Sequence, residues 1–235
     1  MSKLVAVMGE SGSGKTTSLE GLDPATTFVV DADKKGLPWR RADAEYNRDA
    51  ANYLVTDETD AALKTLRVVD SNPKYAHIRT FVVDTVNGLM VADEARRINE
   101  KGYDKWQDMA WSIWGLVDYA LTARDDLVVV FLCHSQTERD DSGYLFTRIR
   151  TSGKKLDKIV LESKFNCVLL AKREAGEFVF ELSGPTSTAK VPRGAFASRT
   201  VPNDMSSVLA TLRDFWGLAP VASRAEAGET HNDKE

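Results

Sequence analysis

The sequence predicts an α/β fold with a mostly parallel central sheet flanked by helices. Three observations lead to this prediction. Short apolar runs rich in β-branched residues recur along the chain, separated by helical segments. The first of these runs is apolar throughout, as expected for a strand that helices cover on both sheet faces. A length of 235 residues is enough for one such domain with a full core.

The composition is that of an ordinary water-soluble globular protein and excludes several classes. Hydrophobic residues make up 43% and charged residues 28% of the chain, and the formal net charge is −4. This balance argues against a globally basic nucleic-acid binder, and no apolar run approaches the length of a membrane span. Met1 is followed almost directly by a strand, with no signal peptide. We therefore expect an intracellular, cytoplasmic protein with no membrane partner.

The segment 9–16 fits the pattern G-x-x-x-x-G-K-[ST] and directly follows the predicted strand 3–8. Its glycines permit positive φ, so that successive N–H groups converge on a phosphate. The lysine of this pattern reaches the β- and γ-phosphates, and the hydroxyl after it ligates Mg²⁺. The sequence thus predicts a site for ATP and Mg²⁺, with nucleotide contacts from Gly9, Ser11, Gly12, Ser13, Gly14, Lys15, Thr16 and Thr17.

Acidic residues end the next two predicted strands. A helix over 14–22 leads to a strand over 26–30, which stops at Asp31-Ala32-Asp33. After a surface helix over 57–69, a third strand, 81–84, ends in Asp84. Acids at the carboxyl ends of parallel strands face the ligand crevice. A strand ending in Asp is the usual partner of such a glycine-rich loop, so Asp84 is expected to hold Mg²⁺ together with Thr16.

The middle of the chain predicts two helical pieces over 87–123, split near Gly102, and a fourth buried strand over 127–133. The second helical piece carries an aromatic-rich face, which a core position or a subunit interface explains. His134 lies at the tip of the fourth strand, where a polar side chain can touch a γ-phosphate. A structural role for this single histidine is the alternative.

The segment 136–158 is hydrophilic and predicts a hairpin that projects from the sheet. Between Arg139 and Arg173 the chain carries nine Lys or Arg residues against four acids. Cationic side chains interleaved with aromatic rings suit single-stranded DNA, and the candidates for this contact are Tyr144, Phe146, Arg148, Arg150, Lys154 and Lys155. A solvated hairpin without a ligand is the alternative.

The C-terminal third predicts strands over 165–170 and 178–182 and a last helix over 208–216. Beyond Pro220 the chain lacks apolar periodicity, which is typical of disorder. We therefore expect a core over 1–200, a helix packed on it within 201–219, and a disordered tail over 220–235.

The order of these motifs resembles the RecA-like P-loop ATPases, and more closely the Sak-type single-strand annealing ATPases encoded by phages. The resemblance covers residues 3 to about 197 and includes a late Lys190-x-x-Arg193-Gly194. It implies that Asp33, in place of a glutamate, polarises the attacking water and that His134 senses the γ-phosphate. It also implies that Lys190 or Arg193 reaches a neighbouring subunit's nucleotide. Only two residues precede the first strand, so a homo-oligomer would form through the core faces.

These inferences predict an ATPase that binds single-stranded DNA and promotes annealing in recombination. Its catalytic residues are Lys15, Asp33, Asp84 and His134. The same resemblance implies three further expectations. DNA stimulates the hydrolysis, a single-strand binding protein is a further partner, and the protein is located in the host cytoplasm. A P-loop nucleotide or small-molecule kinase, with the basic hairpin as its lid, is one alternative. A module that binds ATP without hydrolysing it is another.

Overall fold

The computed structural model describes residues 1–102, 104–139, 142–151 and 160–224. Within them, one sheet has the order β3-β2-β4-β5-β1-β7-β8-β9, with β6 paired to β5 outside this path. The strands from β3 to β7 in this order pair in parallel, and β6, β8 and β9 pair antiparallel. The strands are β1 Lys3–Gly9, β2 Thr27–Asp31, β3 Tyr53–Val55, β4 Thr80–Asp84, β5 Val128–Arg139, β6 Leu145–Ile149, β7 Cys167–Glu174, β8 Glu177–Glu181 and β9 Thr200–Pro202. The mostly parallel α/β sheet is therefore confirmed.

The position of β5 between β1 and β4 brings the predicted site residues to one edge of the sheet. Gly9, at the end of β1, is in register with His134 on β5. Asp84, at the end of β4, is in register with Leu132 on the other side of the same strand. His134 therefore lies between the glycine-rich loop and the acid of β4, in the middle of β5 and not at the tip of a strand that ends at 133 as the sequence predicts.

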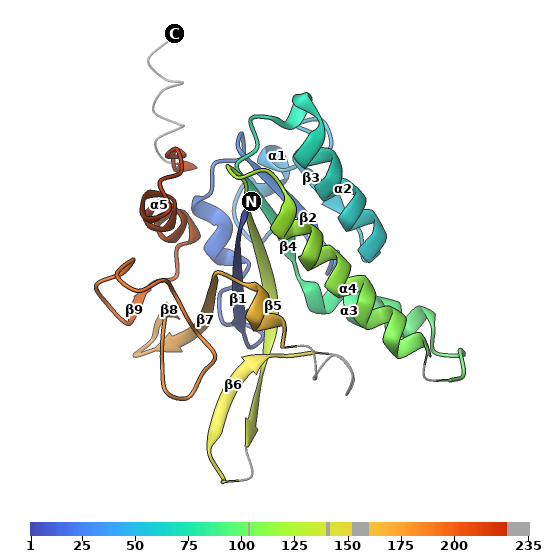
Figure 1. The fold of residues 1–235 in the computed structure, drawn as a ribbon. Helices are drawn as coiled ribbons and strands as arrows, with labels where there is room; N and C mark the ends of the chain where they lie inside the picture. Colours follow the sequence, from blue (N-terminus) through green and yellow to red (C-terminus); the bar gives the residue numbers. More distant parts are fainter. Residues whose placement is uncertain (103, 140–141, 152–159, 225–235) are drawn as a thin grey trace.

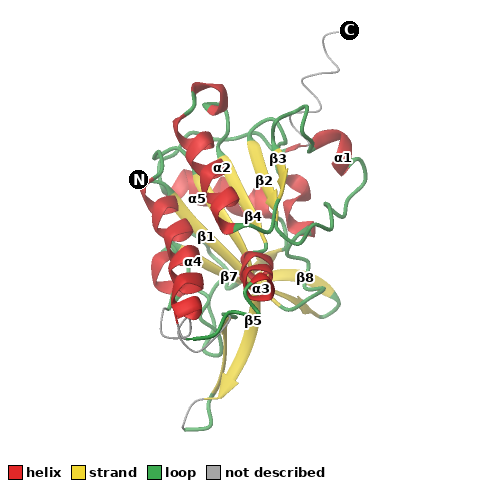
Figure 2. Ribbon diagram, turned by 90° about the vertical axis from the view of Figure 1, so that its right-hand side faces the viewer, coloured by secondary structure: helices red, strands yellow, loops and turns green. Residues whose placement is uncertain are grey.

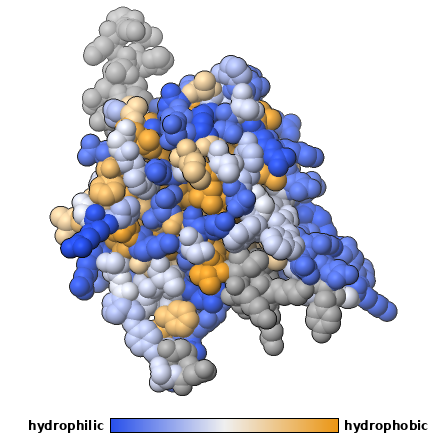
Figure 3. All heavy atoms as spheres, in the orientation of Figure 1, coloured by the Kyte–Doolittle hydropathy of each residue, from blue (hydrophilic) through white to orange (hydrophobic). Residues whose placement is uncertain are grey.

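Helices cover both faces of the sheet (Figure 1). One face packs against α2 Thr59–Ser71, α3 Val86–Arg96 and α4 Asp104–Thr122, and the other against α5 Met205–Phe215 and the 3₁₀ turn η1 Thr17–Gly21. The buried positions of α2 are 59, 62, 66 and 69, which is the three-to-four spacing of an amphipathic helix. Hydrophilic residues predominate over α2 and α4 on the right-hand side of Figure 3. Among the described residues, no helix has the length and apolar character needed to cross a bilayer.

A projecting hairpin is formed by β5 and β6, as the sequence predicts. The first six residues of β5 are buried in the sheet, whereas those from His134 onward are partly or fully exposed. Residues 135–139 pair with β6 beyond the edge of the sheet, and Figure 2 shows β5 continuing into this arm. Thr147 of β6 also exchanges backbone hydrogen bonds with Thr186 and Thr188, at 2.8 and 2.9 Å.

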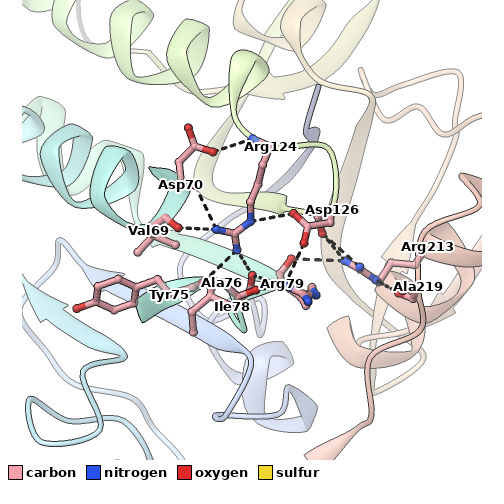
Figure 4. Close-up of polar contacts among 10 residues, drawn as sticks. All are labelled: Val69, Asp70, Tyr75, Ala76, Ile78, Arg79, Arg124, Asp126, Arg213 and Ala219. Atoms are coloured by element: carbon pink, nitrogen blue, oxygen red, sulfur yellow. Dashed lines mark hydrogen bonds and ion pairs between the residues drawn. The ribbon is translucent and has the colours of Figure 1, made fainter. Parts of the chain in front are cut away.

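Two buried or half-buried arginines tie the opposite edge of the sheet together (Figure 4). Arg124 donates to the carbonyls of Val69 and Ile78 and to the Asp126 carboxylate. Arg213 of α5 is 2% exposed, and its guanidinium donates to the carbonyls of Ala219 at 2.8 Å and Asp126 at 3.2 Å. These contacts join α2, the amino end of β5 and the segment after α5.

The structure corrects the predicted helix over 14–22, because only the turn η1 forms there. The Ser18 hydroxyl binds the carbonyl of Lys15 at 2.6 Å, and such local side-chain bonds compete with an α-helix. The sequence analysis also missed the short helix α1, Ala42–Glu45, and the three-residue strands β3 and β9 at the ends of the sheet path. Short 3₁₀ turns occur at η2 Pro73–Tyr75 and η4 Leu161–Lys164. Of the tail expected to be disordered, residues 225–235 lie outside the described residues.

Candidate functional site

The loop after β1 has the backbone geometry of a phosphate cradle. Gly12 and Gly14 have φ values of +77° and +88°, a region that side chains disfavour. A Cβ on Gly9 would lie 2.6 Å from the carbonyl oxygen of Ala171, so glycine is needed where β1 passes β7. The loop therefore has the positive-φ glycines that the motif requires, and the predicted nucleotide contacts Gly9, Ser11, Gly12, Ser13, Gly14, Thr16 and Thr17 surround it.

Lys15 is 6% exposed and folds back onto this loop. Its Nζ donates to the carbonyl oxygens of Gly9 at 2.9 Å and Glu10 at 2.7 Å. Burial lowers the pKa of Lys15, although the negative charge of Asp84 opposes this shift. The ammonium group is thus held at the mouth of the cradle by neutral acceptors, which a phosphate can replace.

Asp84 is 1% exposed and has the environment of a metal ligand. The Thr16 hydroxyl hydrogen-bonds its carboxylate, and within the described residues its Oδ1 has no hydrogen-bond partner. Burial raises the pKa of Asp84 to about 6. A buried carboxylate with an unpaired oxygen beside a threonine hydroxyl fits Mg²⁺, which takes one or two protein oxygens and the oxygens of its phosphates. The residues present therefore fit the Mg²⁺ that the motif implies.

Asp33 lies beside this pair and is held by two side chains. Its Oδ2 forms an ion pair with Lys35 at 2.7 Å, and its Oδ1 accepts from the Thr85 hydroxyl at 3.0 Å. Burial opposes ionisation of Asp33, but these hydrogen bonds and the Lys35 charge outweigh it and lower the pKa of the carboxyl. Asp33 is consequently ionised at neutral pH. Thr85 also caps α3 by accepting from the N–H of Gly88 at 3.1 Å, so one hydroxyl connects Asp33 to the start of this helix.

Asp31 is in register with Asp84 on the neighbouring strand, but its carboxylate is held by different partners from those of Asp33. Its Oδ2 accepts from the N–H of Gly36 at 2.8 Å and from the hydroxyl of Tyr53 at 2.7 Å. These bonds close the turn after β2, and that turn carries Lys35 to Asp33. Asp31 therefore shapes the loop, while Asp33 offers its carboxylate to the site.

His134 joins the site to the hairpin through Asn87, in the first turn of α3. The side-chain oxygen of Asn87 accepts from the N–H of His134 at 2.7 Å, and its amide donates to the carbonyl of Arg150 at 3.0 Å. The N–H of Arg150 in turn donates to the carbonyl of His134 at 2.7 Å. Burial and the charge of Lys15 lower the pKa of His134, which keeps its imidazole neutral at pH 7.

A cleft of about 410 Å³ separates the glycine-rich loop from the hairpin. The hairpin side is lined by the hydroxyl-bearing residues Ser135, Thr137 and Thr147, and the strand side by Lys172 and Arg173. The alternation of β5 and β6 turns Phe146 and Arg148 away from this lining, because they pair with Glu138 and Gln136 on the other face.

The residues predicted to contact DNA have different surroundings. Arg150 is exposed, whereas the Arg148 side chain is 14% exposed and forms an ion pair with Glu138 at 3.4 Å. Tyr144 is 44% exposed, and its hydroxyl donates to the carbonyl of Pro185. Phe146 is partly buried. Lys154 and Lys155 lie outside the described residues.

The two late basic residues are both exposed. Lys190 pairs through its backbone with Val168, the second residue of β7, so it lies away from the loop end of the sheet. Arg193 follows three residues later. The structure therefore does not bring Lys190 to the nucleotide site of its own chain.

Sequence reasoning missed Lys35, Asn87 and Tyr53. Lys35 carries a possible signal, because a cation two residues after Asp33 can fold back onto it. Asn87 and Tyr53 depend on contacts across 47 and 22 residues of sequence, which no local pattern reveals. A polar residue such as Asn87 within a helical pattern is usually taken to face solvent, yet Asn87 is only 5% exposed.

The cradle, the lysine and the threonine–aspartate pair together define a P-loop nucleotide-binding ATPase. A family model described as an AAA domain matches residues 2–192, and the chain belongs to that family. The matched region includes every site residue described above except Arg193. Comparison with curated proteins gives no match to an individual protein.

Proposed function

We propose that this ATPase binds single-stranded DNA along the β5–β6 hairpin and that its nucleotide state controls the binding. The observation that carries the proposal is the bonding of one side chain, Asn87, to both His134 and Arg150. One of these residues borders the phosphate cradle, and the other lies within the basic stretch between Arg139 and Arg173. The resemblance to Sak-type proteins extends the proposal to strand annealing in recombination by a phage-encoded protein.

The nucleotide half of the proposed mechanism uses the buried groups around β1. The loop N–H groups and Lys15 bind the phosphates, and Thr16 and Asp84 hold the metal. Bound Mg²⁺ supplies positive charge that neutralises the phosphates during transfer. Asp33, ionised and fixed by Lys35 and Thr85, accepts a hydrogen bond from the attacking water. Its side chain is one methylene shorter than glutamate, so the expected hydrolysis is slow.

The coupling step follows from the position of His134. A γ-phosphate held by Lys15 lies beside the neutral imidazole, which can donate to it or lose that contact after hydrolysis. Because Asn87 binds the backbone of His134, a shift of β5 at this residue also moves the carbonyl of Arg150. Such a movement controls DNA affinity only if the two nucleotide states prefer different hairpin positions.

The DNA half uses positive charge and aromatic rings on the hairpin. Arg150 is exposed and can contact a phosphate directly. Arg148 must first exchange Glu138 for a phosphate. Tyr144 and Phe146 offer rings for base stacking. Lys154 and Lys155 continue the same basic segment.

Oligomerisation is part of the proposal. Lys190 and Arg193 are both exposed, and Lys190 stands apart from the site of its own chain. In a homo-oligomer assembled through the core faces, either residue can reach the nucleotide of a neighbour. An arginine or lysine supplied in this way raises hydrolysis by about 10³ to 10⁵ where it operates.

The test is the rate of ATP hydrolysis with and without a single-stranded oligonucleotide, with Lys15→Ala as the blank. Stimulation by the oligonucleotide is the expected result. A hydrolysis rate that is the same with and without DNA, together with a DNA affinity that is the same with and without nucleotide, would contradict the coupling. Phosphate transfer to a nucleoside instead of water would establish the kinase alternative, and tight ATP binding without turnover would establish the binding module.

A further inference from the structure

The sheet order fixes the direction in which a nucleotide lies across the loop. The groups suited to the γ-phosphate and its metal, Asp84 and His134, come from β4 and β5 on one side of β1. The phosphates must therefore cross the end of β1 toward its other neighbour, β7. The nucleoside consequently leaves the loop on the side of the β7–β8 hairpin.

An aromatic ring and an amide lie close to the loop on that side. A Cβ on Gly14 would be 3.0 Å from Cδ1 of Phe178 and 3.2 Å from Oδ1 of Asn203. The two residues are also joined, because the N–H of Asn203 donates to the carbonyl of Phe178 at 3.1 Å. Side chains from β8 and from the segment after β9 thus stand against the last glycine before Lys15.

The β7–β8 turn presents this ring rigidly. Ala175 and Gly176 both have positive φ, at 51° and 92°, which is the geometry of the two-residue turn that matches strand twist. The turn sets Arg173 directly opposite Phe178, and the guanidinium carbon lies 4.6 Å from the ring centroid. Both side chains are exposed, and Phe178 is 41% exposed.

We propose that Arg173 and Phe178 form the nucleobase platform of the ATP site, with Asn203 beside the ribose. A planar guanidinium and an aromatic ring are the two protein groups on which a base stacks. Nδ2 of Asn203 is buried and, within the described part of the chain, has no hydrogen-bond partner. It offers a donor to an oxygen of the ribose. The platform depends on the nucleotide site and not on DNA binding.

The experiment compares two probes, Mg·ADP and inorganic tripolyphosphate, by calorimetric titration of the full chain. Phe178→Ala and Arg173→Ala are expected to weaken ADP binding by about 5- to 100-fold, the effect of losing one stacking partner. Tripolyphosphate has no base, so its affinity should stay within twofold of the wild-type value. Lys15→Ala should weaken both probes.

Phe215→Ala provides the matched control, because Phe215 is also an exposed phenylalanine, 46% exposed, at the far end of α5. It should change neither affinity. Unchanged ADP affinity in both platform variants would overturn the proposal. An equal loss of ADP and tripolyphosphate would also overturn it, because that result indicates a distorted loop. Neither outcome bears on stimulation by DNA, so the two proposals fail separately.

Discussion

Asp33 and Gly88 are in such close contact that no side chain fits between them. A Cβ on Gly88 would lie 2.5 Å from Oδ1 of Asp33 and 3.0 Å from the carbonyl oxygen of Ala32. Gly88 belongs to the first turn of α3, which Thr85 caps. The helix that holds Asn87 against β5 therefore also sets the position of the carboxylate proposed to orient water.

Gly88→Ala should consequently lower kcat while leaving nucleotide affinity close to the wild-type value. The added methyl group displaces the Asp33 carboxylate, and misplacement of a catalytic group by about 1 Å costs on the order of 100-fold in rate. Steady-state ATPase assays check this. Gly115→Ala is the control, since nothing lies within 4 Å of its Cβ position in α4. That change should stabilise the fold by about 0.5–1 kcal/mol. A kcat in Gly88→Ala equal to that of wild type would exclude the positioning role.

Asp84 should make the metal-free protein less stable as pH rises. Burial raises its pKa to about 6 from an ordinary 3.8, so between these values the folded chain binds more protons than the unfolded chain. The free energy of unfolding therefore falls across this window. Asp84→Asn avoids the cost of ionising a buried carboxyl. Its free energy of unfolding should exceed that of wild type by about 3 kcal/mol above pH 7, and the two should be nearly equal near pH 4. Urea titrations in EDTA at several pH values measure this difference, and a constant difference would contradict the assignment.

Arg213 should stabilise the fold without affecting the nucleotide. Its guanidinium donates to carbonyls of Ala219 and Asp126 at the edge of the sheet opposite the loop (Figure 4). Arg213→Met leaves these buried acceptors unpaired and should lower the free energy of unfolding by about 3 kcal/mol or more. Mg·ADP affinity measured below the unfolding transition should stay unchanged. A variant that unfolds at the wild-type urea concentration would show that the contacts contribute nothing.

Asn87→Ala should break the proposed connection between nucleotide and hairpin. Loss of its bonds to His134 and Arg150 should cost about 1–3 kcal/mol in the free energy of unfolding and remove stimulation of hydrolysis by DNA. Asn166→Ala is the control, because the Asn166 side chain accepts from the N–H of Leu4 at the other end of the sheet. Asn166 is exposed, so this variant should lose less stability than Asn87→Ala, and it should keep the stimulation. Equal stimulation in both variants would rule out the coupling through Asn87.

Arg150 and Arg148 should differ in their contribution to DNA binding. Arg150 is exposed, so Arg150→Ala should reduce the slope of log affinity against log salt by about 0.7, the value for one phosphate contact with a single strand. Arg148→Ala should change the slope less, because Glu138 competes for the guanidinium. Fluorescence anisotropy of a labelled oligonucleotide at several salt concentrations measures both slopes. Identical slopes in wild type and Arg150→Ala would remove Arg150 from the interface.

The sequence predicted the elements whose local pattern is strong. The apolar runs of β1, β4 and β5 and the loop at 9–16 identified the sheet edge on which Lys15, Asp84 and His134 meet. The helix expected over 14–22 was wrong, because only the 3₁₀ turn η1 forms there. Strands β3 and β9 have three residues each, too few for a period to be visible. The roles of Asn87 and Phe178 depend on chain segments distant in sequence, which only the fold brings together.

The unbroken course of β5 determines how the hairpin can respond to the site. The strand passes through His134 without a bulge or turn and continues for five more residues, to Arg139. At about 3.3 Å per residue this outer part extends roughly 16 Å beyond His134, the residue proposed to contact the γ-phosphate. With the same rise per residue, a tilt of about 5° at His134 would displace Arg139 by more than about 1 Å. If the nucleotide moves His134, as proposed, an unbroken strand would make the displacement larger at Arg139 than at the site, and the bonds of Thr147 to Thr186 and Thr188 would have to follow or break.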